Sequence, residues 1–408
     1  MDKVLARWTR RGLTAVCALL ALSSGIAGAA DGDARSRVMA LFPDAGAMGP
    51  PAWVKPGVRL TYYAATASVP HGRYVYRRSE DGRGQWQDAQ GRRYIREEAI
   101  GASGHGYNQL NVVALSEKAV AIEARMYTFL NYDGPPKILS LNAIIGLPAV
   151  GGDFWVHPRL LARLGERDTP EITVLRMPFK RKGKTYQALA IRGIGKGKDV
   201  EFVYDLATGI LLHSHFATDP AAGTRTVLSH CYLEAVRPVQ VPWADAPAPA
   251  WTRQVGVLRY KGTYVGAGSG VMPVSIPASL ELRVLRRGKG WLQYRQRAQF
   301  GVPPRASRAE FRRAAGNAQW GGPWLPPQGL GGLREGQVLD RDPLTKVTVS
   351  VTGLGAGPSG DRVVRIAEVG PVHRIEYTYH ATSGRLLGYV EKDSAMGQTI
   401  SFHLTGTQ

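Results

Sequence analysis

Apolar and polar side chains alternate along much of the chain, which is the period-two pattern of β-strands with one buried face. Residues 280–284 place Leu, Leu and Val between charged positions, and residues 292–300 resume the alternation after a Gly-Lys-Gly turn at 288–290. Residues 120–126 show the same pattern in the first half, with Val, Ile, Ala and Met at every second position. These segments predict antiparallel strands joined by tight turns.

Helix signals are sparse. We expect one short helix at 158–164, which begins at a proline, and another at 307–315, where arginines gather on one side. The sequence therefore predicts a mainly β fold with a few short helices.

The chain contains an internal repeat. Residues 201–212 align without gaps on residues 376–387, with Glu, Tyr, Gly and two Leu identical in both copies. The matched element is typical of a strand, a tight turn and a second strand, in which Gly209 and Gly384 supply the positive φ of the turn. The glycines thus have a structural explanation that requires no function.

A second match lies upstream of the first. Residues 154–164 align on residues 323–333, so Trp155 corresponds to Trp324. We expect the two tryptophans to be equivalent structural anchors beneath the sheets.

The repeat defines two modules, which we place at 53–237 and 253–408, each a curved antiparallel sheet. Both open alike, because the Leu-Thr-Tyr of 60–62 is matched by the Leu-Arg-Tyr of 258–260. Residues 238–252 between them are rich in proline, which predicts an extended, semi-rigid linker.

The repeated element at 201–212 and 376–387 resembles hairpins of the lipoprotein-carrier family of periplasmic half-barrels. The resemblance covers about a dozen residues in each copy. It implies that each curved sheet wraps a hydrophobic cavity that accepts acyl chains. It carries over no catalytic residue.

The first 30 residues have the composition of a cleaved signal peptide, with a basic start, an apolar core and small residues at 27–30. The apolar core is shorter than the roughly 20 residues of a membrane span. The pair Arg10 and Arg11 also fits a twin-arginine signal, so Sec and Tat export both stay open. We expect a periplasmic protein in which residues 31–52 form an N-terminal extension.

Composition changes this picture in two respects. Cleavage would remove Cys17 and leave Cys231 as the single thiol, so the mature chain would have no intramolecular disulfide. The formal net charge is +20, and it becomes +17 once four basic residues and one acidic residue leave with the signal. Export separates the protein from cytoplasmic nucleic acid. We therefore expect as partner an anionic lipid, an envelope glycan or an acidic protein, with peripheral membrane contact also open.

Two basic clusters are the candidate ligand-binding sites. Both are predicted hairpin tips, where cations at the rim of a sheet would pair with a phosphate or a carboxylate. Their residues are Lys180, Arg181, Lys182, Arg286, Arg287 and Lys289.

Three histidines offer a metal site as an alternative. His213 and His215 share one face of a predicted strand, and His230 lies on the returning strand. Together they could hold zinc or copper. The competing interpretation is ordinary core or surface histidines, because the second module has Gly388 and Val390 where His213 and His215 stand. We expect no other cofactor.

Signals of catalysis are weak. The chain contains no Gly-x-Ser-x-Gly nucleophile elbow, and the acidic pair Asp340 and Asp342 is interpreted as solvated surface. No motif in the sequence argues for an enzyme, although the sequence does not decide the question.

We therefore expect a periplasmic, non-enzymatic binding or carrier protein for a lipid-like or other anionic envelope ligand. One alternative is an envelope scaffold that binds an acidic partner protein. Another is a metal-dependent protein that uses His213, His215 and His230. The sequence leaves open the ligand, the oligomeric state and the relative orientation of the modules.

Overall fold

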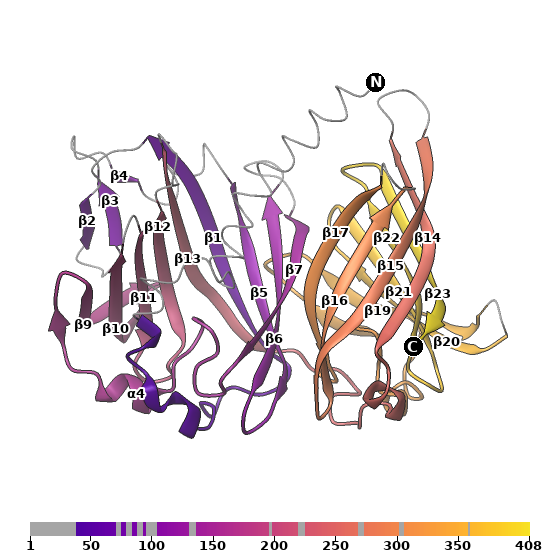
Figure 1. Cartoon of the computed structure of the whole chain (residues 1–408), viewed down its shortest axis with the longest axis horizontal. Coiled ribbons are helices and arrows are strands. Elements are labelled where there is room, and N and C mark those ends of the chain that lie inside the picture. The colour runs from indigo at the N-terminus through magenta and orange to yellow at the C-terminus, as the bar shows by residue number, and fades with distance from the viewer. Residues whose placement is uncertain are drawn as a thin grey trace.

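Two ten-stranded antiparallel sheets dominate the protein, one in each half of the chain (Figure 1). This computed structural model describes residues 38–70, 75–78, 84–87, 93–94, 104–129, 136–195, 198–218, 225–267, 273–301, 306–357 and 360–408. The predicted mainly β fold with two similar modules is confirmed.

Each large sheet runs from one edge strand to the other through hydrogen-bonded neighbours. The first sheet consists, in this spatial order, of β7 (Pro136–Gly146), β6 (Val120–Phe129), β5 (Gly104–Leu115), β1 (Val58–Pro70), β13 (Arg225–Pro238), β12 (Leu211–Thr218), β11 (Lys198–Asp205), β10 (Lys184–Gly195), β9 (Ile172–Arg181) and β8 (Arg167–Asp168). The second consists of β17 (Ser307–Gly316), β16 (Trp291–Phe300), β15 (Pro273–Gly288), β14 (Val257–Ala267), β23 (Gln398–Thr407), β22 (Leu386–Asp393), β21 (His373–His380), β20 (Arg362–Val369), β19 (Thr348–Ala356) and β18 (Val338–Arg341). A separate three-stranded sheet contains β2 (Val75–Arg78), β3 (Gly84–Gln87) and β4 (Arg93–Tyr94).

The two large sheets have the same strand order, so β1 corresponds to β14, β5 to β15, and so on to β13 and β23. Even the irregularities recur. The pairing of β1 with β13 shifts register between Thr61 and Tyr62, and that of β14 with β23 shifts between Arg259 and Tyr260. The repeat seen in the sequence is therefore a repeat of the whole sheet. The first module inserts β2–β4 between its β1 and β5.

The tryptophan elements hold equivalent places in the two modules. Trp155 forms an isolated bridge with Ile210, and Trp324 forms one with Arg385. Trp155 is fully buried and Trp324 is 2% exposed. Both tryptophans therefore anchor their own module, as the alignment predicts.

The turn glycines allow each tryptophan-containing segment (154–164 and 323–333) to pack closely against the hairpin of its own module (201–212 and 376–387). Gly209 has φ 77° and Gly384 has φ 66°, which confirms the predicted positive φ. A Cβ at Gly209 would lie 1.9 Å from the carbonyl oxygen of Val156, and one at Gly384 would lie 1.8 Å from that of Leu325. Only glycine allows these hairpins to touch the segment beneath them.

Of the two predicted helices, only the first exists. It is α4 (Pro158–Arg163), and the described chain also contains the 3₁₀ segments η1 (Pro43–Ala47), η3 (Ala250–Arg253) and η4 (Pro327–Gly329) and a helical turn at residues 38–39. The helix predicted at 307–315 is wrong, because this segment is β17 and pairs with β16 over its whole length. Its residues have good helix propensity, but pairing with a neighbouring strand overrides that preference.

Each sheet packs its inner face on the tryptophan element. Tyr62 donates to the carbonyl of Leu211 at 3.1 Å, and Tyr260 donates to that of Leu386 at the same distance. These bonds satisfy buried hydroxyl groups at equivalent places in the two cores.

The Pro-rich linker is not an extended spacer as predicted, because its apolar residues belong to the second core. Val239, Val241 and Trp243 are 0–7% exposed and pack in that cluster. The Trp243 indole donates to the carbonyl of Gln319 at 3.2 Å. The prolines set the path of the chain, whereas the hydrophobic residues between them attach it to the second module.

The predicted signal peptide, with Cys17, lies outside the described residues. Of the predicted extension at 31–52, the structure describes 38–52, where Val38 and Phe42 join the first core. In the part of the chain that is described, no helix has the length and hydropathy to cross a membrane.

Candidate binding site at the module junction

The outward face of β1, β5 and β6 is covered by the second module, whose edge strand β17 lies beside β7 (Figure 1). The approach is close, because a Cβ at Gly316 would lie 2.2 Å from the carbonyl oxygen of Val113. Five polar residues of this face are at most 4% exposed. They are Arg59, Thr61, Gln109, Glu123 and Arg125.

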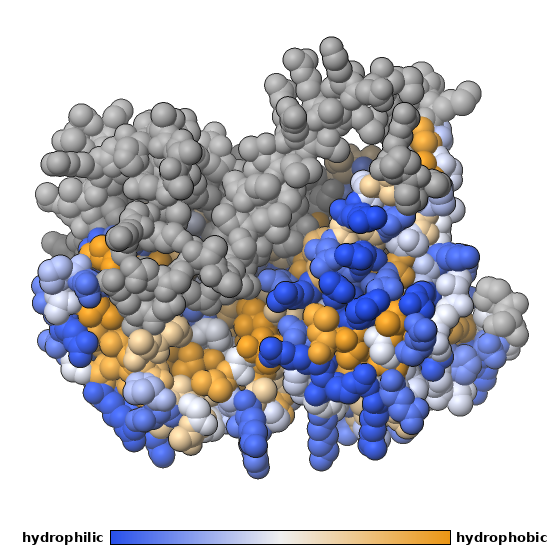
Figure 2. Space-filling view, in the orientation of Figure 1, coloured by the Kyte–Doolittle hydropathy of each residue, from blue (hydrophilic) through white to orange (hydrophobic). Residues whose placement is uncertain are grey.

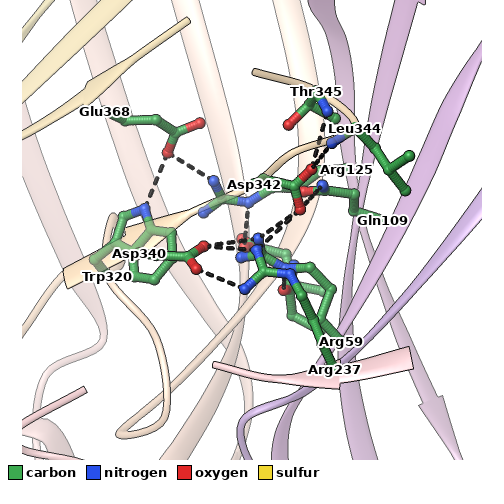
Figure 3. A network of polar contacts seen from close by, with 12 residues as sticks. Arg59, Gln109, Arg125, Arg237, Trp320, Asp340, Asp342, Leu344, Thr345 and Glu368 are labelled. Carbon is green, nitrogen blue, oxygen red and sulfur yellow. Dashed lines mark hydrogen bonds and ion pairs between the residues drawn. The ribbon is translucent and has the colours of Figure 1, made fainter. Parts of the chain in front are cut away.

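A first cluster of ion pairs joins the modules around two aspartates (Figure 3). Arg59 Nη1 lies 2.9 Å from Asp340 Oδ2, and Arg237 Nη1 lies 2.6 Å from Asp340 Oδ1. Asp342 Oδ2 accepts from Arg237 Nη2 and from Gln109 Nε2, both at 2.9 Å. Both arginines and the glutamine belong to the first module, and both aspartates belong to the second.

A second cluster continues the junction. Glu123 Oε1 accepts from Arg313 Nη2 at 2.7 Å, while its Oε2 accepts from Arg125 Nε at 3.1 Å. Arg125 Nη1 donates in turn to Glu368 Oε2 at 2.7 Å, and the Trp320 indole donates to the same oxygen at 3.0 Å (Figure 3). Buried charges of both signs therefore alternate across the contact between the two modules.

The pKa shifts agree with this pairing. Burial alone would raise the pKa of Glu368, but Arg125, His373 and the indole hydrogen bond outweigh it and hold the pKa at about 2. Burial would likewise raise the pKa of Asp342, and hydrogen bonds from the Thr345 backbone and Arg237 lower it. Both carboxylates are therefore ionised at neutral pH and pair as anions with arginines of the first module.

Sequence reasoning missed this junction. It assigned Asp340 and Asp342 to solvated surface, whereas they are 8% and 3% exposed. A period of two shows which residues share a face, but it does not show that another module covers that face. The one signal in the sequence was the alternation of Glu123 and Arg125 on one predicted strand.

A cleft of about 690 Å³ opens where the linker, the end of β5 and the β15–β16 turn meet. Leu115, Trp291 and Leu292 supply apolar walls. Its charged lining consists of Asp245, Arg253, Arg287 and Lys289. Its volume falls in the range of small-molecule sites, roughly 300–1,000 Å³.

The cleft contains two of the predicted ligand-binding residues, and they differ in their freedom to bind. Arg287 donates to the carbonyls of Thr252, Arg253 and Val255, so it fastens the linker to β15. Lys289 is exposed in the turn and has no ion pair with any described residue. Arg286 is exposed nearby but does not line the cleft.

The other predicted cluster lies elsewhere, at the β9–β10 tip of the first module (Figure 1). Arg181 and Lys182 both pair with Glu234, and Arg181 also stacks 4.6 Å above the Tyr232 ring. Lys180 is exposed beside them. The two predicted clusters therefore do not form one site.

The three predicted histidines do come together, on the outward face of the first sheet. His215 Nδ1 lies 3.1 Å from His230 Nδ1, and the ring of His213 stacks on Tyr232 at 4.4 Å. Burial, followed by the neighbouring histidines, lowers the pKa of His215 well below its usual value. Across the described residues, no group of three or more His, Cys, Asp or Glu side chains has an arrangement that could hold a metal ion.

The described inner face of the second sheet offers little of the space that the family resemblance implies for an acyl chain. Its inner face leaves a cavity of about 50 Å³ among residues that include Leu282, Tyr294 and Tyr377. One water molecule needs about 10–15 Å³ of space of this kind, so the cavity holds only a few waters and is too small for an acyl chain. Aromatic side chains fill the interior instead.

Comparison with known proteins assigns no family. No protein-family model matches this chain, and no curated protein matches it.

Similarity to solved structures is weak. The chain is similar to a β-barrel-like protein of the domain of unknown function DUF1849 from Brucella abortus, with 9% identity, 86% of this chain and 96% of that chain covered, and a TM-score of 0.16. It is also similar to a protein of the DUF3598 family from Nostoc punctiforme, with 11% identity, 86% and 96% coverage and a TM-score of 0.14. A third is isotype 1 transferrin binding protein B from Neisseria meningitidis, with 11% identity, 86% and 77% coverage and a TM-score of 0.13. Such scores give no argument about function.

Proposed function

We propose that this protein is a non-enzymatic binding protein of the bacterial envelope, exported to the periplasm, that holds an anionic amphiphile in the junction cleft. The observation that carries the proposal is the combination of apolar walls and unpaired cations in one cleft of about 690 Å³. The cations are Arg253 and Lys289, both exposed and without an ion-pair partner in the described part of the chain.

The two halves of an amphiphile would meet different parts of the cleft. Burial of an apolar tail against Leu115, Trp291 and Leu292 contributes roughly 25 cal/mol for each Å² removed from water. A phosphate or carboxylate headgroup would accept charge-assisted hydrogen bonds from Arg253 and Lys289. We place the apolar tail in this cleft and not in the small cavity inside the second sheet.

Two lysophospholipids of equal chain length test this function, because they differ mainly in headgroup charge. We expect isothermal titration calorimetry to show that lysophosphatidylglycerol binds the mature protein at least about tenfold more tightly than zwitterionic lysophosphatidylcholine. A tenfold preference corresponds to about 1.4 kcal/mol, the size of one or two charge-assisted hydrogen bonds.

The double variant R253Q/K289Q should lose this preference. The matched control K55Q/R167Q removes the same charge from exposed positions of the first module and should keep it. Equal affinity of the wild type for the two lipids would refute the proposal, and so would an equal loss of preference in both variants.

A further inference from the structure

The outward face of β14–β17 carries a row of three arginines on adjacent strands. Arg283 on β15 lies directly opposite Arg295 on β16, which lies directly opposite Arg312 on β17. Cβ atoms of such pairs are about 4.5–5.5 Å apart, so like charges repel. Figure 2 shows hydrophilic side chains over much of this part of the second module.

The neighbouring rows of the same face add more cations than carboxylates. Glu281 lies 3.1 Å from Arg283, and Glu310 lies 3.2 Å from Arg297. Arg312 has no ion pair with any described residue. Counted over the described residues, seven cations share the face with two carboxylates, a net of five positive charges. The cations are Arg259, Lys261, Arg283, Arg295, Arg297, Arg308 and Arg312.

The equivalent face of the first module is the one buried at the junction. Strand order and register put Arg283 at the position of Asn111, and Arg295 at the position of Glu123. In the first module the arginines of this face bind carboxylates on and beside β18 and β20 of the second module. The same surface of the repeat is therefore an interface in one copy and lies open in the other.

We propose that the outward face of β14–β17 is a docking surface for an acidic partner protein, which presents carboxylates to it as the second module presents them to the first. This inference does not depend on the ligand of the cleft. Arginine pairs with carboxylates in a bidentate manner, and a concentration of charge also speeds encounter with an oppositely charged surface.

Two other occupants fit the structure less well. A second copy of this chain would have to offer Asp340, Asp342 and Glu368, but these are buried in its own junction. A membrane would present lipid phosphates, whereas the equivalent face of the first module binds carboxylates.

Labelled poly-L-glutamate serves as the probe, and its affinity for the intact mature protein is measured by fluorescence anisotropy at about 0.15 M salt. We expect the triple variant R283Q/R295Q/R312Q to bind it at least tenfold more weakly than the wild type. The control K55Q/K118Q/R167Q removes three exposed charges from the first module and should change the affinity less than twofold. The triple variant should melt at or above the wild-type temperature, because it removes repulsion within the arginine row.

The outcomes separate the alternatives. Equal losses in the triple variant and its control would overturn the proposal, because binding would then follow only the total charge. Vesicles containing phosphatidylglycerol supply a second arm. The triple variant could lose affinity for these vesicles and bind poly-L-glutamate as tightly as the wild type does. That result would overturn the proposal in favour of a membrane. The cleft variant R253Q/K289Q should keep poly-L-glutamate binding within twofold, so failure of the cleft and failure of this surface are distinguishable.

Discussion

Glu123 lies between two buried guanidinium groups at the module junction, so its removal is a severe test of that junction. Its side chain is fully buried and accepts from Arg313 at 2.7 Å and from Arg125 at 3.1 Å. The substitution Glu123→Ala leaves both buried arginines with less compensating charge. Breaking a buried ion pair from one side costs about 3–5 kcal/mol.

The expected change in melting temperature follows from the size of the chain. For the chain of about 380 residues that the proposed signal cleavage leaves, the entropy of unfolding is about 0.8 kcal/mol per K. A loss of 3–5 kcal/mol therefore lowers Tm by about 4–6 °C if the modules unfold together. Differential scanning calorimetry measures this shift.

Glu310 provides the matched control, because it pairs with Arg297 at 3.2 Å on the exposed face of the second sheet. An exposed pair contributes about 0–1 kcal/mol, so Glu310→Ala should lower Tm by about 1 °C or less. The double variant E123A/R313A should lose less stability than the sum of its single variants, since it removes one uncompensated charge. Equal Tm losses for Glu123→Ala and Glu310→Ala would refute this account of the junction.

Three further predictions concern individual buried groups. The pKa of His215 lies below its unfolded value of about 6.5. Its contribution to the free energy of unfolding is therefore constant above pH 6.5 and falls below that pH by up to about 1.4 kcal/mol per pH unit. Urea midpoints measured at pH 7.5, 6 and 5 should accordingly depend less on pH in H215Q than in the wild type. Burial raises the pKa of Cys231 to about 12, so Ellman's reagent at pH 8 should label the thiol only after unfolding, and labelling of the native protein would contradict its burial. Gly384→Ala should lower the free energy of unfolding by about 1–3 kcal/mol, because its Cβ would lie 1.8 Å from the Leu325 carbonyl oxygen. Gly355→Ala, whose Cβ would meet open space, should change that free energy by less than about 0.5 kcal/mol. Equal losses in the two variants would refute the steric argument.

The architecture could be predicted because the chain contains the same sequence pattern twice, so each copy supports the interpretation of the other. The matched elements around Gly209 and Gly384 constrain one local structure twice, and the tryptophans follow in register. The segment at 307–315 was predicted incorrectly because its helix propensity is local, while its pairing partner β16 is part of a neighbouring hairpin.

The site was less predictable than the fold. The sequence located Arg287 and Lys289 at a hairpin tip, but it did not reveal that Leu115 of the other module completes their cleft. The sequence does put the opposite charges of Glu123 and Arg125 on one face of a predicted strand, but that pattern is also typical of a solvent-exposed face. Both features arise from how two sheets pack together, and the sequence pattern of one sheet does not contain that information.

Native mass spectrometry tests the binding function most directly, with the protein purified from the periplasm, where we propose that it resides, and then extracted with organic solvent. The account predicts an excess mass that extracts as an anionic amphiphile from the wild type and from K55Q/R167Q, and that is absent from R253Q/K289Q. A wild-type mass equal to that of the bare polypeptide, or an excess mass that R253Q/K289Q retains, would contradict it.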